Sequence, residues 1–346
     1  MNDLALKTVA TIAISMAGAV AAQAATTVAF LMPDQASTRY EEHDWPGFEA
    51  AMKELCADCT LIYQNANADA ALQQQQFNSV IAQGATIVVL DPVDSAAAAA
   101  LVEIAHSQDV KVIAYDRPIP DLPADYYVSF DNEGIGNAIA QSLVDHLKAE
   151  GVPEGAGVLQ VNGSPTDAAA GLIRDGIDSA LDSSGYVTLA EFDTPDWAPP
   201  AAQEWVAGQI TRFGDQIVGV VAANDGTAGG TIAALKAAGV DPVPPVSGND
   251  ATIAALQLII AGDQYNTISK PSEIVARAAA EVAVQLMNGE TPEATHSLYD
   301  TPSQLFTPAV VTAENIKAEI FDKGIQTAAQ VCTAEYAEAC AALGIQ

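Results

Sequence analysis

Short runs of Val, Ile and Leu alternate with longer helical stretches along most of this chain, and this alternation restricts the fold more than any other feature. The β-type runs are Val28–Met32, Leu61–Gln64, Ile87–Leu90, Val112–Tyr115, Tyr127–Phe130, Gly157–Val161, Thr188–Phe192, Val218–Ala222, Val246–Ser247 and Asn266–Ser269. Continuous apolar strands separated by helices are typical of parallel sheets that are covered on both faces.

The helical stretches include Trp45–Leu55, Ala70–Ala82 and Ala96–Ser107. About ten strands are too many for one small sheet, and 346 residues exceed what one hydrophobic core usually serves. We therefore expect an α/β protein with two doubly wound, Rossmann-like lobes built on parallel sheets.

Two segments resemble each other and support paired lobes. Ile87–Asp91 leads through Asp94 and Ser95 into an Ala-rich helix, and Val218–Ala222 leads through Asn224–Thr227 into another. Ligands of open α/β sheets bind at the carboxyl ends of strands, near helix N-termini. Helix capping by Asp and Asn is the alternative explanation for each such residue.

The N-terminal segment Met1–Ala24 has the order of a secretory signal peptide. It carries Lys7, an apolar stretch from Val9 to Val20, and the small residues Ala22-Gln23-Ala24. A core helix is the alternative. We predict that residues 1–24 are removed and that the mature protein is periplasmic or extracellular.

Acidic residues greatly outnumber basic ones, with 44 Asp and Glu against 13 Lys and Arg, for a net charge of −31. Such a surface repels phosphate backbones, so we expect no nucleic acid partner. A transcriptional regulator with two similar lobes would need a basic helix-turn-helix at its N-terminus, where this chain carries the expected export signal.

The four cysteines form two close pairs, Cys56 with Cys59 and Cys332 with Cys340. In an exported protein, an even number of cysteines at short spacing indicates disulfides. A C-x-x-C motif can also be redox-active or half of a zinc site. None of the four histidines lies at ligand spacing from either pair, so we predict two structural disulfides and no metal site.

Polar and aromatic residues follow several predicted strands at the point where each ends. They are Arg39, Tyr40, Asp116, Arg117, Asp167, Trp197, Asn224, Asp250 and Lys270. Carboxylates, forked Arg donors, an amide and flat rings together suit a sugar, whose hydroxyls both donate and accept while its C–H faces stack on rings. Trp197 could instead be a core residue.

Other chemistries fit less well. Gly229-Gly230 lacks the spacing and the Lys of a phosphate-binding loop, and Gly163-Ser164-Pro165 is a loop rather than a nucleophile elbow. Paired carboxylates could serve glycoside hydrolysis, but accidental pairs are easy in so acidic a chain. We expect a binding protein with no cofactor rather than an enzyme.

Seven segments carry motifs in a fixed order along the chain. They are Ala114–Pro118 (AYDRP), Tyr127–Glu133 (YVSFDNE), Asn162–Asp167 (NGSPTD), Thr194–Trp197 (TPDW), Ala223–Gly230 (ANDGTAGG), Ser247–Asp250 (SGND) and Lys270–Pro271. Essentially the whole mature chain thereby resembles the type I periplasmic binding proteins, in particular the D-xylose-binding branch. The motifs YDR, SFDN and NDxTAGG are specific in combination, and the paired cysteines resemble a secreted subgroup.

The resemblance implies lobes of residues 25–130 with 269–304 and of residues 131–268 with 305–346. Crossings would lie near Phe130–Asn132, Ile268–Ser269 and Pro302–Leu305, with the sugar in the cleft between the lobes. The implied polar contacts are Arg39, Asp116, Arg117, Asp167, Asn224, Asp250 and Lys270, while Tyr40 and Trp197 would stack on the sugar. One departure is Ala169, which stands where the family usually has a ligand-binding asparagine.

From this resemblance we expect a monomeric receptor for a monosaccharide, D-xylose or a related aldose, that closes at a hinge and feeds the permease of an ABC importer. A sugar sensor that presents its closed form to a membrane receptor kinase is the alternative.

The export and cysteine patterns together predict a mature protein that begins at Ala25 and has no free thiol. Both disulfide loops are short, so each should stabilise the fold by less than the typical ~2–4 kcal/mol. Intact-mass measurement of the secreted protein, with and without reduction before alkylation, tests this. Alkylation of all four cysteines without reductant would contradict the disulfides.

Overall fold

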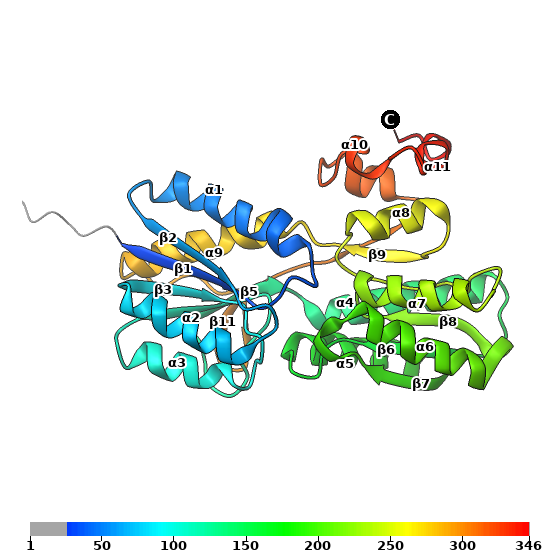
Figure 1. Ribbon diagram of the computed structural model, residues 1–346, viewed down its shortest axis with the longest axis horizontal. Helices are drawn as coiled ribbons and strands as arrows, with labels where there is room; N and C mark the ends of the chain where they lie inside the picture. The colour runs from blue at the N-terminus through cyan, green and yellow to red at the C-terminus, as the bar shows by residue number, and fades with distance from the viewer. Residues whose placement is uncertain (1–25, 346) are drawn as a thin grey trace, which may run out of the picture.

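The structure, a computed structural model, describes residues 26–345, so the predicted signal peptide lies outside the described residues. Two main sheets stand side by side, each between layers of helices (Figure 1). Among residues 26–345, no helix is both long enough and apolar enough to cross a membrane.

The first lobe, as we use the term, is a seven-stranded sheet with its helices. In spatial order its strands are β10 (His296–Leu298), β11 (Thr301–Phe306), β5 (Tyr126–Phe130), β4 (Lys111–Tyr115), β3 (Ala85–Leu90), β1 (Thr27–Met32) and β2 (Thr60–Asn65). Its helices are α1 (Trp45–Leu55), α2 (Ala70–Ala82), α3 (Ala98–His106) and α9 (Ser272–Met287).

The second lobe contains a three-stranded sheet and a strand pair. The three strands are β7 (Val187–Asp193), β6 (Gly157–Asn162) and β8 (Ile217–Ala222), and the pair is β12 (Ala309–Thr312) with β9 (Asn266–Ser269). A bridge from Val220 to Val246 continues the sheet from β8 toward β9. The helices are α4 (Asn132–Ala149), α5 (Ala168–Asp182), α6 (Pro199–Phe213), α7 (Asp225–Ala237) and α8 (Ile253–Ala261).

The predicted α/β class is confirmed, with mainly parallel sheets. Two pairs are antiparallel, β10 with β11 and β12 with β9. β10, β11 and β12 went unpredicted as strands: they are short, and β11 contains Pro302 and polar residues that interrupt an apolar pattern.

The chain passes between the two lobes three times, after β5, after β9 and after β11. β5 leads directly into α4, β9 leads into α9, and β11 leads into β12. The third passage follows Phe306, the last residue of β11. The lobe boundaries inferred from the sequence remain a proposal.

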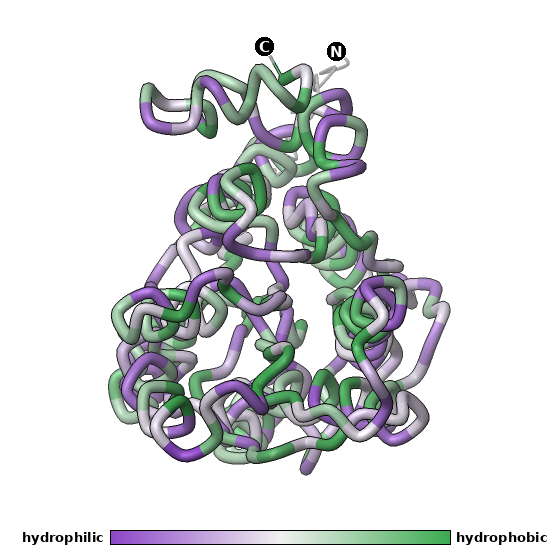
Figure 2. Tube along the Cα trace, turned by 90° about the vertical axis from the view of Figure 1, so that its right-hand side faces the viewer, coloured by the Kyte–Doolittle hydropathy of each residue, from purple (hydrophilic) through white to green (hydrophobic). Residues whose placement is uncertain are grey.

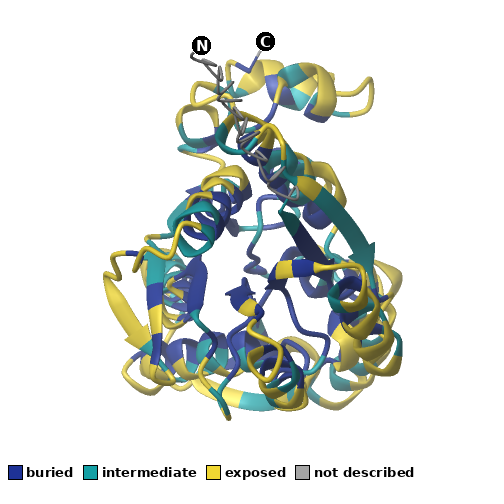
Figure 3. Ribbon diagram, turned by 90° about the vertical axis from the view of Figure 1, so that its left-hand side faces the viewer, coloured by how far each residue is buried: buried dark blue, intermediate teal, exposed yellow. Residues whose placement is uncertain are grey.

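The central apolar strands of each lobe are buried, and the exposed residues lie on outer helices, loops and edge strands such as β7 (Figure 3). Residues 28–32 of β1 are fully buried because helices cover both faces of their sheet. Hydrophobic and hydrophilic residues alternate along the helices (Figure 2), as expected for helices with one packed face.

The C-terminal segment extends beyond the two sheets (Figure 1). It contains α10 (Ala328–Val331) and α11 (Ala337–Ala342), and its apolar residues pack against α8. Both predicted disulfides are formed: Cys332–Cys340 joins these helices, and Cys56–Cys59 closes the turn after α1.

Helices α4 and α5 pack unusually closely in the second lobe because glycines lie at their contact. A Cβ atom at Gly136 of α4 would collide with the carbonyl oxygen of Ile173, and one at Gly176 of α5 would collide with that of Glu133. The side chains at a helix contact set the distance between the axes, so these glycines fix α5, whose first turn faces the space between the lobes.

We predict that Gly176→Ala lowers the free energy of unfolding by about 2 kcal/mol or more, because the added methyl group meets rigid backbone. Gly171→Ala is the matched control on the same helix, where the new Cβ meets nothing within 4 Å. It should be neutral or stabilise by up to ~1 kcal/mol, since alanine favours the helix. Urea denaturation followed by circular dichroism measures both, and equal stabilities would contradict the prediction.

Candidate ligand-binding site

All nine residues predicted from the sequence line a single cavity between the lobes. Its other lining residues are Ser37, Asn132, Ala169, Ile173 and Asn249. The space amounts to about 330 Å³, including its opening to solvent. The carboxyl ends of both sheets therefore meet at this cavity, as expected for open α/β sheets.

The first lobe contributes two pairs of neighbouring residues. Arg39 and Tyr40 lie at the start of a short π-helical turn (Tyr40–Asp44) that precedes α1. Asp116 and Arg117 come directly after β4. All four are buried.

The second lobe contributes residues at the beginnings of helices. Asp167 is the N-cap of α5 and accepts a hydrogen bond from the amide of Ala169 at 2.8 Å. Asn224 is the N-cap of α7 and forms a capping box with Thr227. The capping explanation that the sequence offered for Asn224 is therefore correct, Asp167 is a cap as well, and both also line the cavity.

Trp197 lies in a 3₁₀ turn after β7 and is buried. Its indole Nε1 donates a hydrogen bond to Oδ2 of Asp167 at 3.0 Å. The opposite edge of the ring lies over Gly163, where a Cβ atom would overlap the ring carbons. The turn orients Trp197 between these contacts.

Arg39 is the centre of a buried ion-pair network. Its Nη1 lies 2.7 Å from Oδ1 of Asp44, and its Nη2 lies 2.5 Å from Oδ2 of Asp116. Tyr40 donates a hydrogen bond to the same Asp116 oxygen at 3.2 Å. Burial would lower the pKa of Arg39, but Asp116 and Asp44 outweigh it and hold that pKa well above the usual value.

Arg117 forms a second network that reaches both lobes. Its Nη2 lies 2.7 Å from Asp34, and its Nε lies 3.2 Å from Oδ2 of Asp167 and 3.5 Å from Asp91. Burial raises the pKa of Asp91 well above its usual value, although Arg117 opposes the shift.

Lys270 follows β9 on the second passage between the lobes and lies near two carboxylates. Its Nζ is 3.3 Å from Asp250 and 3.7 Å from Asp116. Burial alone would raise the pKa of Asp116, but Arg39, Lys270 and Arg117 hold it well below the usual value. Asp116 is therefore ionised over the ordinary pH range.

Three of the lining residues have positive φ angles, which non-glycine residues rarely adopt. The angles are 57° at Asp116, 54° at Trp197 and 109° at Asp250. Backbone strain of this kind clusters at functional sites, where the surrounding structure maintains it.

Several buried polar atoms around the cavity lack a hydrogen-bond partner. Nε of Arg39, Nε of Arg117 and Oδ1 of Asn249 are among them. Unpaired buried polar atoms are costly. Nε of Arg117 nevertheless lies 3.2 Å from Asp167, and Nε of Arg39 lies 3.7 Å from Asp250, so both nitrogens keep an ionic partner.

The sequence did not predict several residues that pair with the two site arginines or line the cavity beside the predicted residues. Asp34, Asp44 and Asp91 pair with the two arginines, and Asn132 and Asn249 line the cavity. Asn132 and Asn249 lie inside the motifs that carry the resemblance, which was the available signal. Asp34 and Asp44 gave none, because nothing in the sequence says which of the 44 acidic residues are buried.

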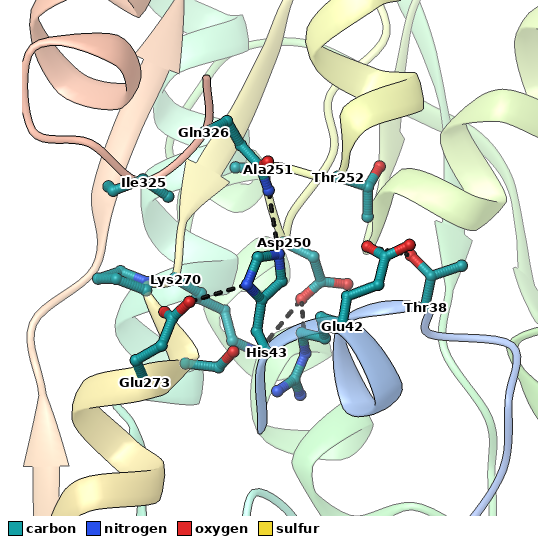
Figure 4. A pocket seen from close by; sticks show the side chains of 13 residues that line it. Thr38, Glu42, His43, Asp250, Ala251, Thr252, Lys270, Glu273, Ile325 and Gln326 are labelled. Carbon is teal, nitrogen blue, oxygen red and sulfur yellow. Dashed lines mark hydrogen bonds and ion pairs between the residues drawn. The ribbon is translucent and has the colours of Figure 1, made fainter. Parts of the chain in front are cut away.

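A neighbouring cavity lies behind Arg39, Asp250 and Lys270, which line both spaces (Figure 4). There His43 contacts Glu273 at 2.8 Å and Gln326 of the C-terminal segment at 3.0 Å. The hydrogen bond with Glu273 raises the pKa of His43. Of these two cavities, most of the nine predicted residues line only the cavity between the lobes.

The cavity joins carboxylates and arginines to a Trp ring and the apolar side chains of Ala169 and Ile173. Within residues 26–345, no group of three or more His, Cys, Asp or Glu side chains is arranged to hold a metal ion.

Comparison with known proteins agrees with this architecture. The family described as "Periplasmic binding protein domain" matches residues 28–291. The chain is 37% identical over 269 residues to the D-xylose-binding periplasmic protein of Escherichia coli, covering 75% of this chain and 80% of that protein. It is 30% identical to the multiple sugar-binding periplasmic receptor ChvE of Rhizobium radiobacter, covering 88% and 92%.

Solved structures share the fold. An ABC transporter solute-binding protein from Clostridium phytofermentans with bound β-D-glucose has a TM-score of 0.81 at 26% identity, over 88% of this chain and all of that one. A carbohydrate transporter solute-binding protein from Chloroflexus aurantiacus with D-glucose has a TM-score of 0.80 at 26% identity, over 88% and 97%. The range that the family matches includes all nine predicted cavity residues and most strands of both sheets, and the chain belongs to the periplasmic binding protein family.

Proposed function

We propose that this protein binds one monosaccharide in the cavity between its lobes and delivers it to the permease of an ABC importer. The observation that carries the proposal is the convergence of nine polar and aromatic residues from both sheets on one cavity. Neither sheet alone supplies a complete site.

The chemistry of the cavity favours a neutral polyhydroxylated ligand. Carboxylates accept hydrogen bonds from hydroxyl groups, and the guanidinium groups of Arg39 and Arg117 donate to them. Hydrogen bonds to charged groups are the stronger ones. The Trp197 ring, with Ile173 and Ala169, offers apolar surface to the C–H face of a sugar ring.

The similar proteins reduce the number of candidate sugars. Two D-xylose-binding periplasmic proteins, at 37% and 34% identity, are among them, together with receptors for multiple sugars. This supports D-xylose or a related aldose as the ligand. The named ABC transporter solute-binding proteins among the structural neighbours support delivery to an importer from the periplasmic or extracellular side, and no observation favours a sensor.

The proposed mechanism is closure of the two lobes around the sugar. Arg39 and Asp116 belong to the first lobe, whereas Asp167, Trp197 and Asn224 belong to the second. A ligand favours the closed form only through contacts that the open form lacks, so contacts to both lobes are required. The monomeric state and the absence of a reaction on the sugar are part of the proposal.

Calorimetric titration with D-xylose, D-glucose, L-arabinose and D-ribose tests the proposed function. The parent protein should bind at least one of them well below millimolar concentration. If none binds in that range, the sugar-binding proposal is wrong.

We predict that Trp197→Ala weakens sugar binding by about 2–4 kcal/mol, the scale of an aromatic binding hot spot. The substitution removes a ring face and the hydrogen-bond donor to Asp167. Calorimetry measures affinity, and thermal unfolding without sugar measures stability.

Trp205→Ala is the matched control, because Trp205 stacks on Phe192 in the same lobe and does not line the cavity. It should lower the melting temperature and leave affinity nearly unchanged. If Trp197→Ala lowers only the melting temperature, Trp197 is a core residue and its proposed stacking role fails.

A second substitution tests which hydroxyl groups of the sugar the protein distinguishes. Ala169→Asn puts an amide into the cavity at the position where the family usually has asparagine, and it should change the discrimination among the four aldoses by about 1–3 kcal/mol. Ala168→Asn is the matched control, because Ala168 faces a different hollow on the surface of α5. Equal selectivity profiles for the two variants would contradict a role of position 169 in specificity.

A further inference from the structure

The two lobes touch directly at a place outside the three connecting passages. Loop 93–95, which follows β3 in the first lobe, meets residues 166–168, which precede α5 in the second. Ser95 N donates to the carbonyl of Thr166 at 2.9 Å, and Ser95 Oγ accepts from the amide of Ala168 at 3.1 Å. Oγ1 of Thr166 donates to the carbonyl of Val93 at 3.3 Å. We call this set of contacts the clasp.

The first-lobe half of the clasp is held rigidly by its own lobe. The buried side chain of Gln73, on α2, donates to the carbonyl of Asp91 and accepts from the amide of Val93, both at 2.8 Å. Nη1 of Arg117 donates to the carbonyl of Pro92 at 3.1 Å. The loop that presents Ser95 is therefore fixed by a residue that also lines the cavity.

The second-lobe half of the clasp is the first turn of α5. The amides of a helix's first turn have no partner inside the helix. The Asp167 side chain accepts from Ala169 N, and Ser95 of the other lobe accepts from Ala168 N. The cap of α5 is thus completed across the cleft, next to the carboxylate that holds Trp197.

We propose that Ser95 is a positioning residue of the binding site, which holds the first turn of α5, and through it Asp167 and Trp197, against the first lobe in the closed form. The proposal rests on the proposed function. Ser95 does not line the cavity, so it acts without touching the sugar.

The effect of Ser95 is confined to the closed form. When the lobes separate, water reaches the amide of Ala168 and replaces the hydroxyl of Ser95. In the structure, where the lobes are in contact, Ser95 is 2% exposed and its hydrogen bond with the amide of Ala168 is partly buried, so removal of the hydroxyl takes away the partner of that amide. The closed form alone is destabilised, and bound sugar is released faster.

Ser95→Ala should therefore release sugar about three- to ten-fold faster, the range that corresponds to one net hydrogen bond. The association rate should change little. Stopped-flow tryptophan fluorescence measures both rates, with D-xylose or whichever of the four titrated aldoses binds best. Small-angle scattering at one subsaturating sugar concentration should show a larger radius of gyration for Ser95→Ala than for the parent.

Three further variants make the test specific. Ser107→Ala is the matched control, because the Ser107 hydroxyl bonds only within the first lobe, to Ile104. Ser95→Thr keeps the hydroxyl and should restore slow release. Thr166→Val removes the clasp hydroxyl on the other lobe and should also speed release of the sugar. If Ser95→Ala does not fold, Thr166→Val alone tests the clasp.

Two failures are distinguishable. A parent protein that binds none of the four aldoses contradicts the proposed function. A parent that binds sugar, with Ser95→Ala and Thr166→Val releasing it at the parental rate, overturns the positioning role of Ser95 and leaves the proposed function intact.

Discussion

The requirement that buried charges be paired organises the centre of this protein. Arg39 and Arg117 are each less than a tenth exposed, and a buried charge without a partner is strongly destabilising. Their carboxylate partners come from loops after different strands, so the turn before α1 and the loop after β4 must meet. Asp116 pairs with Arg39 and lies near Lys270, which follows β9. The same charges that need pairing thereby connect the first lobe to one of the passages into the second.

This pairing also determines what kind of ligand suits the cavity. Each guanidinium group is already paired with carboxylates of this network, so an anionic ligand would have to break the pairing. A neutral ligand with many hydroxyl groups leaves the pairing intact and uses the remaining lone pairs and N–H groups of the residues that line the cavity. Because the side chains are fixed before the ligand enters, little conformational freedom is lost on binding.

The sequence predicted the local structure well and the supporting residues poorly. Helices Trp45–Leu55 and Ala70–Ala82 were predicted with their observed bounds, and residues typical of helix starts, Pro46 in the first and Asp69 before the second, delimit them. All nine predicted residues reach one cavity, since each follows a strand and the strand ends converge. Asp34 was not predicted because its partner, Arg117, is far away in the sequence, and Asp44 was not predicted because no sequence pattern marks it as buried. Strands β10 and β11 were not predicted because a hairpin at the edge of a sheet needs little apolar surface.

Capping and ligand binding were alternatives at the level of sequence, but the geometry makes them one role. A helix N-terminus that faces a cleft has to orient its cap toward that cleft, and the cap's second oxygen then faces whatever occupies the cleft. At Asp167 one oxygen accepts from Ala169 N, while the other lies near Trp197 and Arg117. A substitution there would change helix stability, the orientation of the aromatic ring and the charge balance at the same time. These contributions can be measured separately only at residues that have a single role. The Ser95 hydroxyl, on the other side of the cleft, therefore reports on closure more directly than the Asp167 carboxylate does.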